Sequence, residues 1–159
     1  MKDEIYSSAK VGTWDESEVY EFDDLVEWAK DQPFTIHIGE GLGICSIKHY
    51  ETKELQKWKG RFCWRAPAAR GQGGALAIFQ EMSSRPTTIV DANIAIACGC
   101  IKGNKITVAD AVRACVQSDL KSLHPTYVMF PRHLIPDKMR GFRKPCCRLV
   151  KALYGHPES

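Results

Sequence analysis

One carboxylate and one pair of basic side chains are the residues of this sequence best suited to chemistry. Asp110 ends the short run "KITVAD" (105–110), which favours a β-strand, and helical turns are expected directly after it. A carboxylate at a strand terminus is held by rigid backbone and faces open space, where it can bind Mg²⁺ together with substrate phosphate. The alternative is that Asp110 caps the helical turn that follows, because Asp is among the best N-cap residues.

The basic pair is Lys59 and Arg61, in the predicted strand "WKGRFCWRA" (58–66). Side chains two residues apart on a strand share one face, so we expect these two cations to lie side by side. Arg binds phosphate through its bidentate fork and Lys binds it as a point charge, so the pair could hold a triphosphate. The alternative is a charged edge strand, in which Lys discourages edge-to-edge aggregation.

The charge distribution also separates the two ends of the chain. The net charge of the 159 residues is +3, but residues 1–57 hold 13 acidic and 6 basic residues, whereas residues 58–159 hold 16 basic and 6 acidic residues. Such asymmetry suggests that the second part faces a polyanion, such as nucleic acid or nucleotide phosphate. A solvated basic surface without a ligand is the other interpretation.

The elements that would position these residues are predicted from hydrophobic periodicity and turn residues. Their mixture indicates an α+β fold with antiparallel strands and packed helices. We predict a loose segment over 1–15, helices over 17–32, 75–82 and 87–104, two strands around a glycine-rich turn within 34–50, strands over 58–66, 105–110, 126–131 and 147–155, and helical turns over 111–120.

The cysteines and the hydropathy pattern limit the function classes. Seven cysteines occur without a CxxC pair, so reduced thiols in an intracellular protein are favoured over a zinc site. No apolar run reaches the roughly 18 residues that a membrane span needs. The first ten residues lack the apolar region of a secretory signal. We therefore expect a cytoplasmic or nuclear protein that is neither secreted nor membrane-bound.

Four short segments, taken in order, carry a family resemblance: "KGRF" (59–62), "DAVRAC" (110–115), "YVMFP" (127–131) and "KALYG" (151–155). Together they resemble the reverse transcriptase of copia-type LTR retrotransposon polyproteins, from about residue 58 to the end. The resemblance implies part of a right-hand polymerase, with residues 58–159 forming fingers and the beginning of the palm. Residues 1–57 would form an acidic helix and a hairpin that lead into the fingers.

The resemblance also implies an activity and roles for individual residues. The activity is template-directed nucleotidyl transfer from a dNTP onto an RNA or DNA template-primer, with Mg²⁺ as cofactor. Asp110 would be the catalytic residue and a metal ligand. The implied nucleotide-binding residues are Lys59 and Arg61 at the β- and γ-phosphates, the backbone of Ala111, Val112 and Arg113 beneath the triphosphate, Cys115 where the family has an aromatic residue under the sugar, and Glu158 where it has Gln.

In the family, a hairpin with Tyr-x-Asp-Asp follows "KALYG" and supplies two further carboxylates of the metal site. These 159 residues contain no such motif. We therefore expect a truncated piece of a longer polyprotein that has no polymerase activity by itself. Two alternatives are a pseudogene-like fragment without function and a non-catalytic nucleic-acid-binding remnant. In the remnant, Trp58, Phe62, Trp64 and Tyr127 would either stack on bases or lie in the core.

Overall fold

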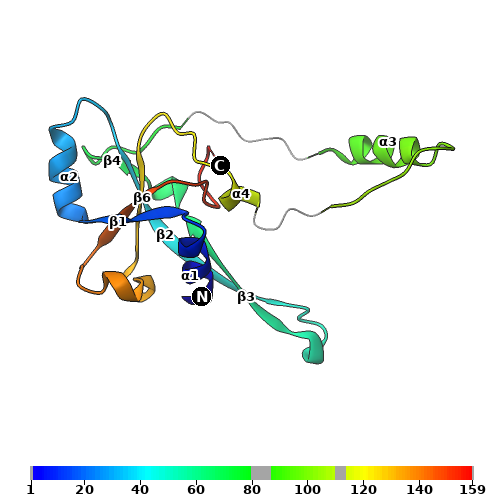
Figure 1. Cartoon of the computed structure of the whole chain (residues 1–159), viewed down its shortest axis with the longest axis horizontal. Coiled ribbons are helices and arrows are strands. Elements are labelled where there is room, and N and C mark those ends of the chain that lie inside the picture. The colour runs from blue at the N-terminus through cyan, green and yellow to red at the C-terminus, as the bar shows by residue number, and fades with distance from the viewer. Residues whose placement is uncertain (1, 80–86, 110–113, 159) are drawn as a thin grey trace.

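A computed structural model describes residues 2–79, 87–109 and 114–158 of the chain, and its centre is a six-stranded β-sheet (Figure 1). The strand order is β1-β6-β5-β2-β3, and β4 pairs with β2. The β2–β5 pair is parallel and the others are antiparallel, so the structure is α+β as predicted. The strands are β1 (Trp14–Glu21), β2 (His37–Lys48), β3 (Lys57–Trp64), β4 (Arg70–Gly71), β5 (Thr126–Met129) and β6 (Pro145–Leu149).

The helices are distributed around this sheet. The α-helices are α1 (Lys2–Lys10), α2 (Phe22–Lys30), α3 (Ile89–Gly99) and α4 (Ala114–Gln117), and short 3₁₀ turns occur at Lys53–Leu55, Ala66–Ala68, Arg132–Leu134 and Asp137–Met139. The sheet combines strands from both parts of the sequence, because β1 and β2 precede residue 58 and pair with β6, β5 and β3.

Both faces of the sheet are covered by apolar side chains. On one face, the rings of Trp14, Phe62 and Phe130 contact one another with centroid separations of 5.2–5.7 Å. On the other face, α2 packs Leu25 and Ala29, both fully buried, into a second cluster of core residues. The predicted helix over 17–32 is confirmed only from residue 22, because the residues before it form β1 and pair with β6.

The prediction of two strands around a glycine turn within 34–50 is wrong, because β2 is a single strand of 12 residues. The reason is a contact across the sheet. A Cβ on Gly39 would overlap the ring of Trp64, and a Cβ on Gly41 would overlap the ring of Phe62. These glycines therefore make room for two large rings of β3 that lie across β2.

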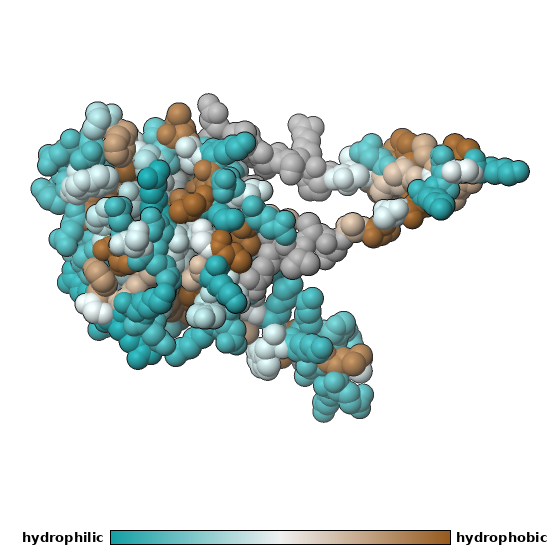
Figure 2. All heavy atoms as spheres, viewed as in Figure 1, coloured by the Kyte–Doolittle hydropathy of each residue, from teal (hydrophilic) through white to brown (hydrophobic). Residues whose placement is uncertain are grey.

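The predicted helix over 87–104 is confirmed as α3, which begins with a capping box. The Thr88 side chain accepts a hydrogen bond from the Asp91 backbone, and the Asp91 side chain accepts one from the Thr88 backbone. None of the α3 residues is buried. Figure 1 shows α3 extending away from the sheet, and Figure 2 shows apolar side chains on its surface.

Three further predictions differ from the structure. Residues 2–10 form α1 instead of a loose segment, because Ile5 packs into the core. Within the predicted helix 75–82, the described residues 75–79 are not helical, and Leu76 instead bridges to Arg70. Residues 105–109 are not a strand, and Asp110 lies outside the described residues. The strands predicted over 126–131 and 147–155 are present in shorter form as β5 and β6.

Candidate functional site

The basic side chains of β3 form one candidate site. Lys59 and Arg61 lie on the face of the strand opposite to the buried rings of Phe62 and Trp64, so they share a face as predicted. The nearby positive charges of Lys48 on β2, and then of Arg61, lower the pKa of Lys59. Three cations therefore crowd this part of the β2–β3 hairpin, and an anion bound there would relieve their repulsion.

The thiol of Cys63, two residues after Arg61 on the same strand, is influenced by charged groups from other elements. Burial raises the pKa of the Cys63 thiol, Arg61 lowers it, and Cys115 and Glu4 raise it further. These effects place Arg61 on β3, Cys115 on α4 and Glu4 on α1 in the surroundings of one thiol. Arg61 and Cys115 therefore both act electrostatically on the Cys63 thiol.

The position of α4 follows from its contacts with the rest of the sheet. Val116 is buried in the core, and two backbone hydrogen bonds join the segment after α4 to the segment after β6. One runs from the Leu120 N–H to the Val150 carbonyl and the other from the Ala152 N–H to the Ser118 carbonyl, each at 2.9 Å. These contacts hold α4 at the core that lies beneath β3.

Asp110, Ala111, Val112 and Arg113 lie outside the described residues, so their predicted roles remain predictions. Within the described ranges, no group of three or more His, Cys, Asp or Glu side chains is placed to hold a metal ion.

The segment "KALYG" lies against the end of β3. The Trp64 backbone N–H donates a hydrogen bond of 2.7 Å to the Tyr154 carbonyl, and Leu153 is fully buried. Gly155 has a φ of +86°, and a Cβ at this position would overlap the Trp64 carbonyl oxygen. Both the backbone conformation and the close approach therefore require glycine at the end of this motif.

Glu158 belongs to a different cluster, which the sequence did not predict. Its backbone N–H donates a hydrogen bond of 3.1 Å to Nδ1 of His156, and its carboxylate raises the pKa of both His37 and His156. These two histidines are 119 residues apart in sequence, so no local pattern indicates that they meet.

The four aromatic residues that were predicted either to stack on bases or to lie in the core differ in their exposure to solvent. Trp58 is 76% exposed near the end of the β2–β3 hairpin, whereas Phe62, Trp64 and Tyr127 are each less than 5% exposed. The three buried rings are core residues. Trp58 alone among these four can therefore stack on a ligand.

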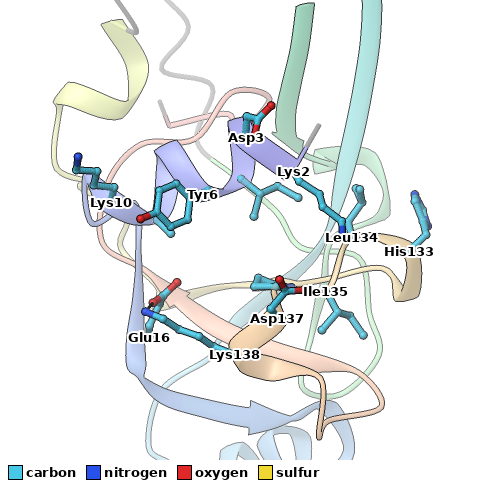
Figure 3. A pocket seen from close by; sticks show the side chains of 13 residues that line it. Lys2, Asp3, Tyr6, Lys10, Glu16, His133, Leu134, Ile135, Asp137 and Lys138 are labelled. Atoms are coloured by element: carbon cyan, nitrogen blue, oxygen red, sulfur yellow. Dashed lines mark hydrogen bonds and ion pairs between the residues drawn. The ribbon is translucent and has the colours of Figure 1, made fainter.

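A cavity of about 620 Å³ lies between α1 and residues 133–138 (Figure 3). Ile5, Leu134 and Ile135 contribute apolar lining, and a salt bridge of 2.8 Å joins Lys138 to Glu16 beside it. The sequence did not predict this cavity, because its α1 wall was expected to be a loose segment.

Comparisons of the chain with protein-family models, with curated proteins and with solved structures found no significant match. Within the part of the chain that the structure describes, no helix is long and apolar enough to cross a membrane.

Proposed function

We propose that this chain is part of the RNA-directed DNA polymerase of a copia-type retrotransposon, and that it contributes the triphosphate-binding face of the fingers and the beginning of the palm. The assembly of the family-like segments supports this proposal. "KGRF" lies on β3, most of "YVMFP" lies on β5, and "KALYG" follows β6 and is hydrogen-bonded to the end of β3. Two of these segments thus lie on strands of one sheet, and the third is hydrogen-bonded to the end of β3.

The electrostatics of β3 support the same proposal. Lys48, Lys59 and Arg61 crowd one face, which favours a highly charged anion over a neutral ligand. In this role Arg61 would bind one phosphate through two parallel hydrogen bonds, and Lys59 would neutralise a neighbouring phosphate. In this role Cys115, which acts electrostatically on Cys63 of the same strand, would lie under the sugar of the nucleotide.

The proposal is nucleotide binding without polymerisation by this chain. The 159 residues contain no Tyr-x-Asp-Asp segment, which in the family supplies two further carboxylates of the metal site. Asp110 by itself cannot supply the several oxygen ligands that two divalent ions need. We therefore expect the purified chain to bind a dNTP and to add none to a primer.

The test is a titration of the purified chain with dATP in the presence and absence of Mg²⁺, followed by primer extension. The Lys59→Ala and Arg61→Ala variants should each weaken dATP binding by about tenfold, because each removes a charge-assisted contact of roughly 1.5 kcal/mol. Asp110→Asn should remove any dependence on Mg²⁺. Lys53→Ala, on an exposed turn of the same hairpin, is the control and should bind dATP like the wild type.

Two results would contradict the proposal. Equal dATP affinity in the wild type and in the Lys59→Ala and Arg61→Ala variants would show that β3 is not the phosphate site. Primer extension by the wild type that Asp110→Asn abolishes would show that the chain is itself a polymerase.

A second candidate function is the binding of single-stranded nucleic acid without catalysis, and the exposure of Trp58 favours it. The β2–β3 hairpin carries an exposed indole at Trp58, on the face of β3 opposite to Lys59, and so offers both a stacking surface and cations that can contact the phosphate backbone. Trp58→Ala should weaken binding of a labelled oligonucleotide by about fivefold or more, since stacking contributes roughly 1–3 kcal/mol per base. Tyr6→Ala, which removes an equally exposed ring from α1, is the control. Binding that is insensitive to Mg²⁺, to dATP and to Asp110→Asn would favour this candidate over the first.

A further inference from the structure

The C-terminal segment 153–158 begins at the fully buried Leu153 and lies against the end of β3. Besides the bond between the Tyr154 carbonyl and the Trp64 N–H, the ring of His156 contacts two aromatic rings. Its centroid lies 4.6 Å from that of Trp64 and 5.2 Å from that of Phe79. The His156 side chain therefore anchors this segment to β3 and to the segment before residue 80.

The hydrogen bonds of His156 fit only the neutral ring. The residue is 4% exposed, its Nδ1 accepts the Glu158 N–H at 3.1 Å, and its Nε2 is buried without a hydrogen-bond partner. Protonation would place a hydrogen on Nδ1, which would then face another donor. The charged ring would also be buried away from water, which disfavours the positive charge.

A second buried histidine lies on the other side of Phe79. The His37 ring of β2 lies 4.6 Å from Phe79 and 4.8 Å from His124, is 4% exposed, and has an unpartnered Nδ1. Among the described residues, His37, His124, His156 and Glu158 are the titratable groups that act on one another in this cluster, and the rings of Trp64 and Phe79 carry no charge.

Burial outweighs the opposing effect of the Glu158 carboxylate at both histidines. It lowers the pKa of His37, and it lowers the pKa of His156 to about 4. Above about pH 6.5, the pKa of an unfolded histidine, the ring is neutral in every form and the closed form keeps its full stability. As the pH falls from about 6.5 toward the lower pKa of the folded state, the open form takes up protons first, so the closed form loses stability.

We propose that residues 154–158 form an acid-released latch, in which the neutral ring of His156 holds the segment on β3 and proton uptake by this ring releases it. Release uncovers Trp64 and breaks the hydrogen bond of its backbone N–H to Tyr154. It also moves the Glu158 carboxylate away from the two histidines. This proposal is independent of the polymerase proposal, because it requires neither nucleotide nor metal.

The test is amide hydrogen exchange of the full chain, followed by NMR at pH 7.5 and pH 5.0 and corrected for intrinsic exchange. The opening equilibrium constant at the Trp64 amide should be about 30-fold larger at pH 5.0 than at pH 7.5. The reason is that the pKa of His156 is about 6.5 in the open form and about 4 in the closed form. The Phe130 amide, bonded to the Pro145 carbonyl in the core, reports global unfolding; that also exposes His156, so its opening constant should rise by a similar factor but stay well below that of the Trp64 amide at both pH values.

The His156→Phe variant keeps a ring in the same place and cannot take up a proton, so it should lose most of this increase. His156→Gln serves the same purpose if the larger ring impairs folding. The control His49→Asn removes an exposed histidine of the hairpin and should retain the full increase. An unchanged Trp64 amide in the wild type, equal opening constants for the Trp64 and Phe130 amides at both pH values, or a full increase in both His156 variants would each overturn the proposal.

Discussion

Replacing Gly155 by Ala tests why the motif "KALYG" ends in glycine. Gly155 has a φ of +86°, where an L-residue costs about 1–2 kcal/mol. The added Cβ would overlap the Trp64 carbonyl oxygen, so the segment must move away from β3. This movement would break the hydrogen bond between Trp64 and Tyr154, which contributes about 0.5–1.5 kcal/mol. We expect Gly155→Ala to lower the free energy of unfolding by about 2–3 kcal/mol in total.

The assay is urea unfolding together with thermal unfolding, in which 1 kcal/mol corresponds to roughly 2–4 °C for a chain of this size. Two controls separate the contributions. Gly74 also has a positive φ, of +79°, but nothing lies near its Cβ position, so Gly74→Ala should show only the backbone cost. Gly73→Ala has neither feature and should change stability by less than about 0.5 kcal/mol. A Gly155→Ala variant no less stable than Gly74→Ala would refute the packing argument.

Three further outcomes follow from the described contacts. Iodoacetamide at pH 8 should quickly alkylate the exposed Cys45, Cys98 and Cys100 and should spare Cys147 until urea is added, because burial raises the pKa of Cys147 to about 12. Equal labelling of Cys45 and Cys147, measured by mass spectrometry, would contradict the structure. Thr88→Ala removes the side-chain cap of α3, which contributes about 1 kcal/mol, so it should reduce the helical signal in far-UV circular dichroism and leave the tryptophan-detected urea midpoint unchanged. Thr88→Ser should retain the helical signal, and an unchanged signal in Thr88→Ala would argue against the cap. Gly41→Ala should destabilise the fold by about 1–3 kcal/mol, because the added Cβ would overlap the ring of Phe62. Gly141→Ala adds a Cβ where no atom lies nearby and should not destabilise the fold, so equal urea midpoints for the two variants would contradict this packing.

Local patterns predicted the elements whose signals are local. The i, i+3, i+4 spacing within Phe22–Lys30 predicted α2, and the alternation around Phe62 predicted β3 and the shared face of Lys59 and Arg61. The helix over 87–104 was predicted because its apolar residues run continuously up to a glycine stop. These signals depend on neighbours within one or two turns of chain, so one sequence was enough.

Long-range contacts explain what the sequence did not predict. Gly39 and Gly41 look like turn residues until the rings of β3 are placed across them, more than 20 residues later in the chain. The helix α1 is short and polar, and it is fixed by burial of Ile5 in a core assembled from distant strands. The cluster of His37, His156 and Glu158 depends on the same kind of contact.

The polymerase proposal is tested most directly by whether the Asp110 carboxylate lies beside the cations of β3. A carbodiimide, which joins an amine to a carboxylate with no spacer, can be applied to the native chain before trypsin digestion and mass spectrometry. Lys59 is the only lysine of peptide 58–61, and Asp110 is the only acidic residue of peptide 106–113, so a link between these peptides identifies the pair. The account predicts this linked pair in the wild type and its loss in Asp110→Asn. A wild-type digest in which Lys59 is linked to Glu4 and peptide 106–113 is not linked to peptide 58–61 would contradict it.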